Sequence, residues 1–183
     1  MTDLHVIGLD PSLTATGLAS SQGWTKVIGQ AGKKTMSYVE RHERIAAVKT
    51  QVVAAVPQDV VLVVMEGPNY GSTDGHAFDR AHLWWDLYAA IVFGRSIPIA
   101  ICPPSVLKTY ATGLGDARKR EVIDAVAHHF PIWQAGRNSN RADAVILMAA
   151  GRDRLSHPLV NLPETHRRAL GSIAWPGAVH ALT

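Results

Sequence analysis

Three acidic residues stand where a sheet and a helix could bring them together. Asp10 ends the apolar run VIGLD, and Glu66 ends the β-branched run VVLVVME. Asp143 lies near the start of NSNRADAVILMAA, a segment whose following residues are apolar and helical in pattern. Neighbouring strands of one sheet hold their ends close together. A helix that enters the sheet at the same level would add Asp143 to the other two acids.

Carboxylates that gather without basic partners repel one another, so such a group favours a cation between them. Mg²⁺ suits these acids, with Mn²⁺ as the alternative, because hard cations take oxygen ligands and keep waters that phosphate oxygens can displace. Two such ions would stabilise the attacking and the leaving oxygen of an in-line phosphodiester displacement. Taken alone, each acid is better explained as a turn former or a helix cap. The combination of all three favours the metal site.

The elements that must position these acids follow from alternating apolar runs and turn residues. We expect strands at 4–9, 14–21, 24–31, 60–65 and 97–102, and helices at 37–56, 76–93, 105–111, 117–129 and 141–155. The first three strands should form an antiparallel meander. This order predicts an α/β fold with a mixed five-stranded sheet flanked by helices, and it is also the order of the ribonuclease H-like fold. Residues 1–155 are expected to form one domain, and 156–183 an irregular tail packed on it or trailing from it.

The composition is that of an ordinary globular protein, with 47% hydrophobic and 18% charged residues among 183. No apolar run approaches the ~20 residues that a bilayer requires. The single cysteine, Cys102, forms no internal disulfide and builds no zinc site, and the first residues lack the pattern of a secretion signal. A reducing, cytoplasmic setting is therefore expected. The net charge of +3 permits a nucleic-acid partner without requiring one.

Basic residues cluster around the GLG turn at 113–115. They are Lys108, Arg118, Lys119 and Arg120. Such groups contact backbone phosphates and supply most of the sequence-independent affinity for DNA. A solvated helix start is the alternative, which the nearby acids make the weaker interpretation. Lys33 and Lys34 are interpreted as surface residues of a hairpin, with contact to a DNA arm as the alternative.

Four motifs resemble, in order and spacing, those of the RuvC family of Holliday junction resolvases. They are IGLDPSLTATGLA, VVMEGP, PPSVLKTYATGLGDARKREVIDAV and RADAVILMAA, and the resemblance covers about residues 4–155. It implies a ribonuclease H-like fold, a homodimer, and magnesium-dependent cutting of two strands of a four-way DNA junction. By matching position it makes Asp10, Glu66 and Asp143 the catalytic metal ligands. It also makes Lys108 and Lys119 the basic residues of the DNA-binding segment.

Two positions depart from the family pattern. Asn140 stands where the family has an acid or a histidine, and its amide oxygen could ligate a metal without adding charge. Asn69 stands where family members often carry an aromatic residue that wedges into the junction. Tyr70, one place later, either supplies that stacking group or is an ordinary loop aromatic.

Other functions remain open at this point. The segment GLDPSLTATG also resembles the first phosphate loop of sugar kinases and actin-like ATPases, but the chain shows no second copy of it. A broader nuclease that cuts flaps and forks, and a non-catalytic protein that binds DNA structures, both fit the same residues. A bacteriophage is one possible source of the protein, which would then act in the cytoplasm of the bacterial host.

The expected helix 76–93 is apolar over most of its circumference. Trp84 and Trp85 point about 100° apart on such a helix, so one can fill the core while the other covers a partner. We therefore expect a homodimer joined through this helix.

Overall fold

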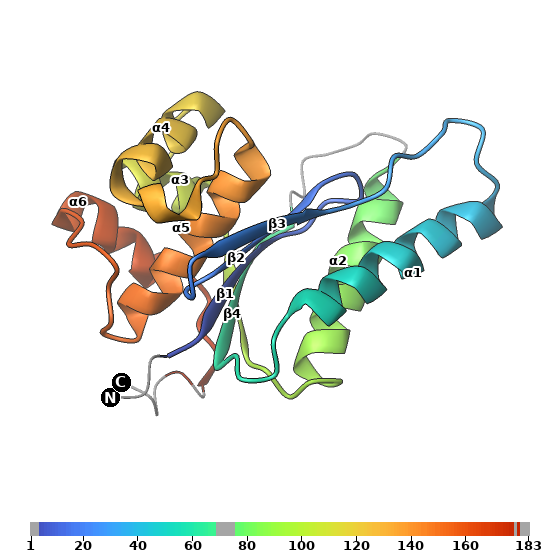
Figure 1. The fold of residues 1–183 in the computed structure, drawn as a ribbon, viewed down its shortest axis with the longest axis horizontal. Coiled ribbons are helices and arrows are strands. Elements are labelled where there is room, and N and C mark those ends of the chain that lie inside the picture. The colour runs from blue at the N-terminus through green and yellow to red at the C-terminus, as the bar shows by residue number, and fades with distance from the viewer. Residues whose placement is uncertain (1–3, 69–75, 178, 180–183) are drawn as a thin grey trace.

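The structure, a computed structural model, describes residues 4–68, 76–177 and 179 of the chain. Its centre is a mixed five-stranded sheet with helices on both faces (Figure 1). The strands are β1 (Val6–Asp10), β2 (Thr16–Ser20), β3 (Trp24–Ile28), β4 (Leu62–Glu66) and β5 (Ile99–Cys102). They lie in the order β3-β2-β1-β4-β5. The antiparallel meander of β1 to β3 and the mixed five-stranded sheet are both confirmed.

Two helices cover one face of the sheet, and the remaining helices lie on the other (Figure 1). The first pair is α1 (Tyr38–Ala55) and α2 (Ala77–Val92). The second group is α3 (Pro104–Thr112), α4 (Lys119–His129), η1 (Pro131–Trp133), α5 (Ser139–Arg154), α6 (Glu164–Arg167) and η2 (Arg168–Ser172). The predicted helices agree to within about two residues at each end. The last strand begins at Ile99, not at residue 97, because Pro98 cannot donate to the ladder.

Alternation along β1 and β4 divides the core into two layers. Ile7 and Leu9 pack with α1 and α2, whereas Val6 packs with α5. Because successive side chains point to opposite faces, Asp10 points to the α5 side, like Val6. The run in β4 is buried on both faces, as its β-branched sequence predicts.

Helix α5 lies against the sheet at two glycines. A Cβ atom on Gly8 would lie 1.9 Å from the carbonyl oxygen of Ala144, and one on Gly17 would lie 2.0 Å from that of Asn140. Only glycine leaves room for the helix backbone at these two points. The first turns of α5 therefore lie directly over the carboxyl end of β1 and the start of β2.

The C-terminal segment is not wholly irregular, since it contains α6 and η2. Arg167 binds the buried Asp153 at 2.7 Å, and Asp153 also accepts a hydrogen bond from Tyr110 at 3.0 Å. Ala174 forms an isolated antiparallel bridge with Ile101 of β5. These contacts fasten the segment to the body of the protein. Of the helices described, none combines the length and the apolar character needed to cross a bilayer.

We expect Gly8→Ala to lower the free energy of unfolding by about 2–3 kcal/mol, because the added methyl group collides with backbone atoms of α5. Gly171→Ala is the matched control, since a Cβ atom there meets nothing within 4 Å. Urea denaturation of the two variants measures the difference. A Gly8→Ala protein within about 0.5 kcal/mol of the wild type would contradict the close approach.

Candidate active site at the ends of β1 and β4

Asp10 and Glu66 are neighbours at the carboxyl ends of two parallel strands. Leu9 lies opposite Met65 in the β1–β4 register, so the next residues of each strand are the two acids. Burial raises the pKa of Asp10 well above its usual value, and the charge of Glu66 and a side-chain hydrogen bond to it raise it further. The ionised form of Asp10 is therefore disfavoured when no cation is bound.

Asp143 reaches the same place from α5. Burial and the negative charge of Glu66 raise the pKa of Asp143 to about 7. The charge of Asp143 in turn raises the pKa of Asp10. The structure thus brings the three acids into one electrostatically coupled group, because α5 crosses the sheet over Gly8 and Gly17.

Lys108 and Lys119 lie near these acids. Both lysines lower the pKa of Asp143, and Lys119 also lowers that of Asp10. Gly113 ends α3 in the left-handed conformation, with φ of 82°, so the chain turns back and α4 begins with Lys119 beside α3.

The other two basic residues of this segment point elsewhere. Arg118 and Arg120 are exposed at the start of α4, and Arg120 lies 3.9 Å from Asp124. Neither contributes to the pKa shifts described for Asp10 and Asp143.

Asn140 is tied to the turn that follows Asp10. Its Nδ2 donates to the carbonyl oxygen of Ala15, and its Oδ1 accepts a hydrogen bond from Ser139 Oγ at 3.1 Å. The amide thus joins the start of α5 to the β1–β2 turn. Tyr70 and Asn69, the residues considered for stacking in a junction, lie outside the described residues.

The acids suit a hard cation in their chemistry but do not form a closed cage. Within the described ranges, no group of three or more His, Cys, Asp or Glu side chains could hold a metal ion by itself. Mg²⁺ is usually bound through one or two carboxylates together with waters and substrate phosphates. The Asp10–Glu66 pair offers such a partial set, and burial followed by the charge of Glu66 raises the pKa of Asp10. The residues therefore fit a cation that binds together with a phosphate group.

Two further residues fix the end of β4, and neither role is predicted from the sequence. The buried Trp84 donates from its indole Nε1 to the carbonyl oxygen of Glu66 at 2.9 Å. Cys102 lies opposite Glu66 in β5, and burial together with the Glu66 charge raises its pKa to about 12. Cys102 therefore stays a thiol and supplies no nucleophile. No local signal marks either role, because both depend on the strand register and the packing of α2.

We expect Asp143→Asn to stabilise the protein at pH 8 without divalent ions. The folded-state pKa of about 7 exceeds the ordinary value of 3.8, so the folded state binds more protons between these pH values. The free energy of unfolding contributed by Asp143 therefore falls as the pH rises through this window. The melting temperature should rise by about 3 °C or more at pH 8, and the gain should shrink towards pH 4.

Asp124→Asn, an exposed acid on α4, is the control and should show no such window. Thermal melts across the pH series in a chelating buffer check the expectation. If Asp143→Asn melts at a lower temperature than the wild type at pH 8, the ionised Asp143 side chain does not destabilise the folded protein.

Comparison with known proteins finds similarity over most of the chain. No protein-family model matches it. Two curated proteins, both named crossover junction endodeoxyribonuclease RuvC, come from Prochlorococcus marinus strains NATL1A and NATL2A. They are 23% and 22% identical to this chain over 157 residues, which cover 81% of this chain and 97% of each relative.

Solved structures agree with the sequence comparison. A Thermus thermophilus RuvC structure matches with a TM-score of 0.61 at 23% identity, covering 84% of this chain and 98% of that one. T. thermophilus RuvC in complex with a Holliday junction substrate matches with a TM-score of 0.61 at 20% identity, covering 85% and 98%. These matches confirm the expected ribonuclease H-like fold. The chain is therefore similar, in sequence and in fold, to proteins named RuvC over most of its length.

Proposed function

We propose that this protein is a metal-dependent, structure-specific endonuclease that cleaves phosphodiester bonds at four-way DNA junctions. The observation that carries the proposal is the coupled group of Asp10, Glu66 and Asp143, which stands beside Lys108 and Lys119. The substrate class follows from the similar proteins, which are named crossover junction endodeoxyribonucleases, and from the similar structure bound to a Holliday junction.

In this proposal Asp10, Glu66 and Asp143 hold two Mg²⁺ ions, with Mn²⁺ as the alternative. Asn140 is a further candidate ligand through its amide oxygen. Bound divalent cations supply a water of lowered pKa and neutralise charge on the phosphate. The protein's own part is to fix the acids at the strand ends. Cys102 remains a thiol, so no covalent intermediate forms on it. The expected products are a 5′-phosphate and a 3′-hydroxyl.

The same proposal assigns the basic residues to the DNA. Lys108 and Lys119, whose charges lower the pKa of Asp143, would hold phosphate oxygens at the cleaved bond. Arg118 and Arg120 extend the positive surface along the exposed start of α4. Tyr70 is the proposed stacking residue. Such an enzyme would act in the bacterial cytoplasm. If a phage encodes the enzyme, this is the cytoplasm of the phage's host.

We expect Asp10→Asn and Glu66→Gln each to reduce cleavage by roughly 100-fold or more, equivalent to about 3 kcal/mol of barrier. Junction binding should stay near the wild-type level, because neither change touches the basic surface. The assay uses a synthetic four-way junction, a matched duplex and a flap, with Mg²⁺ and Mn²⁺ titrated in turn. Asp124→Asn again serves as the control and should cut normally.

The same assay separates the other functions. Near-wild-type cutting by both acid variants would contradict the metal site. Junction binding without cleavage in either metal would identify a non-catalytic DNA-binding protein. Equal cutting of the flap and the junction would identify a broader branched-DNA nuclease.

We also propose that the working unit is a homodimer joined through α2. Phe78 and Trp85 of α2, and Phe93 directly after its last residue, are 86%, 61% and 77% exposed. Trp84 instead fills the core, and Trp85 packs edge-on against Tyr88 with ring centroids 5.9 Å apart. Aromatic groups gathered on one exposed face are typical of an interface. A two-fold dimer would present two identical sites to a roughly two-fold junction.

We expect Trp85→Glu to give a folded monomer, because the charge falls on the exposed face and leaves the core intact. That monomer should nick junctions without coordinated cutting of two strands. Ile132→Glu, on an exposed residue of η1, is the control and should remain a dimer. Sedimentation at micromolar concentration, with and without junction DNA, measures the state. A wild type that sediments as a monomer in both conditions would refute the dimer.

A further inference from the structure

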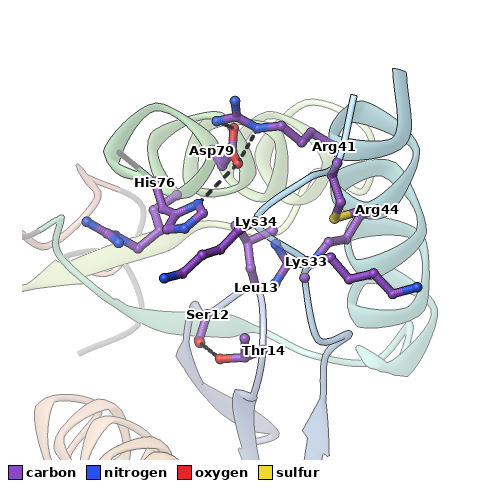
Figure 2. A pocket seen from close by; sticks show the side chains of 12 residues that line it. Ser12, Leu13, Thr14, Lys33, Lys34, Arg41, Arg44, His76 and Asp79 are labelled. Atoms are coloured by element: carbon purple, nitrogen blue, oxygen red, sulfur yellow. Dashed lines mark hydrogen bonds and ion pairs between the residues drawn. The ribbon is translucent and has the colours of Figure 1, made fainter. Parts of the chain in front are cut away.

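A second basic site lies on the face of the sheet opposite the acids. It is a pocket of about 390 Å³ between the β1–β2 turn, the loop from β3 to α1, and the first turns of α1 and α2 (Figure 2). Its charged lining consists of Lys33, Lys34, Arg41, Arg44, Arg80 and Asp79, with His76 at the rim. In Figure 2 the Lys34 side chain lies between His76 and the turn that carries Ser12 and Thr14.

The single carboxylate of this pocket is already bound. Asp79 accepts hydrogen bonds from Arg41 at both oxygens, at 2.9 Å from Nε and 2.8 Å from Nη2. Asp79 also lies 3.9 Å from His76, so this carboxylate is not a free counter-charge for Lys33, Lys34 and Arg44. Among the residues that line the pocket, positive charge is left in excess.

Arg44 is a buried cation at the back of the pocket. It is only 7% exposed, and its Nε donates to the carbonyl oxygen of Gln30 at 2.7 Å. A Cβ atom on Gly32 would lie 2.7 Å from its Nη1, so the loop backbone rests against the guanidinium group. In the part of the chain that the structure describes, no carboxylate forms an ion pair with Arg44.

Acids do lie near Arg44 on its outer side. Glu40 and Glu43 line a neighbouring hollow that shares Arg44 and Lys33 with the pocket. The carboxylate of Glu40 is bound by Ser37, through the backbone nitrogen at 2.7 Å and the hydroxyl at 2.8 Å. A buried guanidinium group without an ion-pair partner is costly, so this arrangement favours an anion from outside.

The pocket and the acids share one turn of the chain. Ser12 and Thr14 line the pocket with hydroxyl groups, and Ser12 lies two residues after Asp10. The two residues of chain from Asp10 to Ser12 span at most about 7 Å. Successive nucleotides of a DNA strand are about 3.4 Å apart along the helix axis. The pocket therefore begins within a few nucleotides of the acids.

We propose that this pocket binds a phosphodiester group of the DNA strand that crosses the β1–β2 turn, within a few nucleotides of the cleaved bond. The proposal rests on the proposed function, because it takes junction DNA as the ligand. Guanidinium and ammonium groups with nearby hydroxyls are the donors that phosphate oxygens receive in such contacts. The contact orients the strand without reading its sequence.

The first test removes the charges of Lys33 and Lys34, which are exposed and form no side-chain hydrogen bond or ion pair within the described part of the chain. Lys33→Ala with Lys34→Ala should lower the salt dependence of junction binding by about one unit, because the contact with one phosphate is lost. Lys26→Ala with Lys49→Ala removes the same charge outside the pocket and should change the slope less. No change, or an equal change in both double variants, would overturn the proposal.

The second test locates the phosphate. Single methylphosphonate groups, which carry no charge, are placed at successive positions on each side of the cut. The wild type should lose affinity at one or two positions within a few nucleotides of the cut, and the Lys33/Lys34 double variant should lose less at those positions alone. Equal losses by both proteins at every position would overturn the proposal.

A free nucleotide also carries phosphate groups and is the other ligand that could occupy the pocket. ATP binding that disappears in the Lys33/Lys34 double variant, with junction binding unchanged, would assign the pocket to a free nucleotide and overturn the DNA proposal. If the wild type cuts junctions and only the pocket tests fail, the proposed function stands without this site. If the wild type neither binds nor cuts a junction, both proposals fall.

Discussion

The close approach of α5 to β1 and β2 is the constraint on which the rest of this structure depends. It is possible only because Gly8 and Gly17 carry no side chain where the backbone of the helix crosses. This approach sets the level at which Asp143 meets the strand ends, and it lets Asn140 join the β1–β2 turn. The apolar remainder of α5 is buried between the sheet and helices α3 and α4, so the helix cannot shift to relieve the crowded acids.

The crowded acids are an electrostatic cost that the fold accepts. Burial and mutual repulsion push the pKa of Asp10 and Asp143 upward, and only Lys108 and Lys119 oppose the repulsion of Asp143. Proteins place such uncompensated charge at functional sites, where a ligand supplies the missing counter-charge. A divalent cation that arrives with a phosphate group would be such a ligand, which is why an open set of carboxylates is compatible with the proposed chemistry.

The β1–β2 turn connects this site to the other face of the molecule. Asp10 stands on the α5 side of the turn, and the cationic pocket of Lys34 and Arg44 opens on the α1 and α2 side. The same helix α2 closes that pocket at its start, supports Glu66 through Trp84, and exposes Trp85 to solvent. One helix thus contributes to the position of β4, to the charged pocket and to the proposed dimer face.

The sequence by itself determined the elements and the strand-end acids. Apolar runs and helical periodicity are local properties, so Asp10, Glu66 and Asp143 could be placed at the ends of predicted elements without coordinates. Only the tertiary structure decided what those elements bring together. Lys33 and Lys34 are exposed, as their hairpin sequence predicts, but that sequence carries no sign of the helices that form a pocket beside them. The support of Glu66 by Trp84 was invisible for the same reason: register and packing arise from contacts between residues far apart in the chain, which no local pattern encodes.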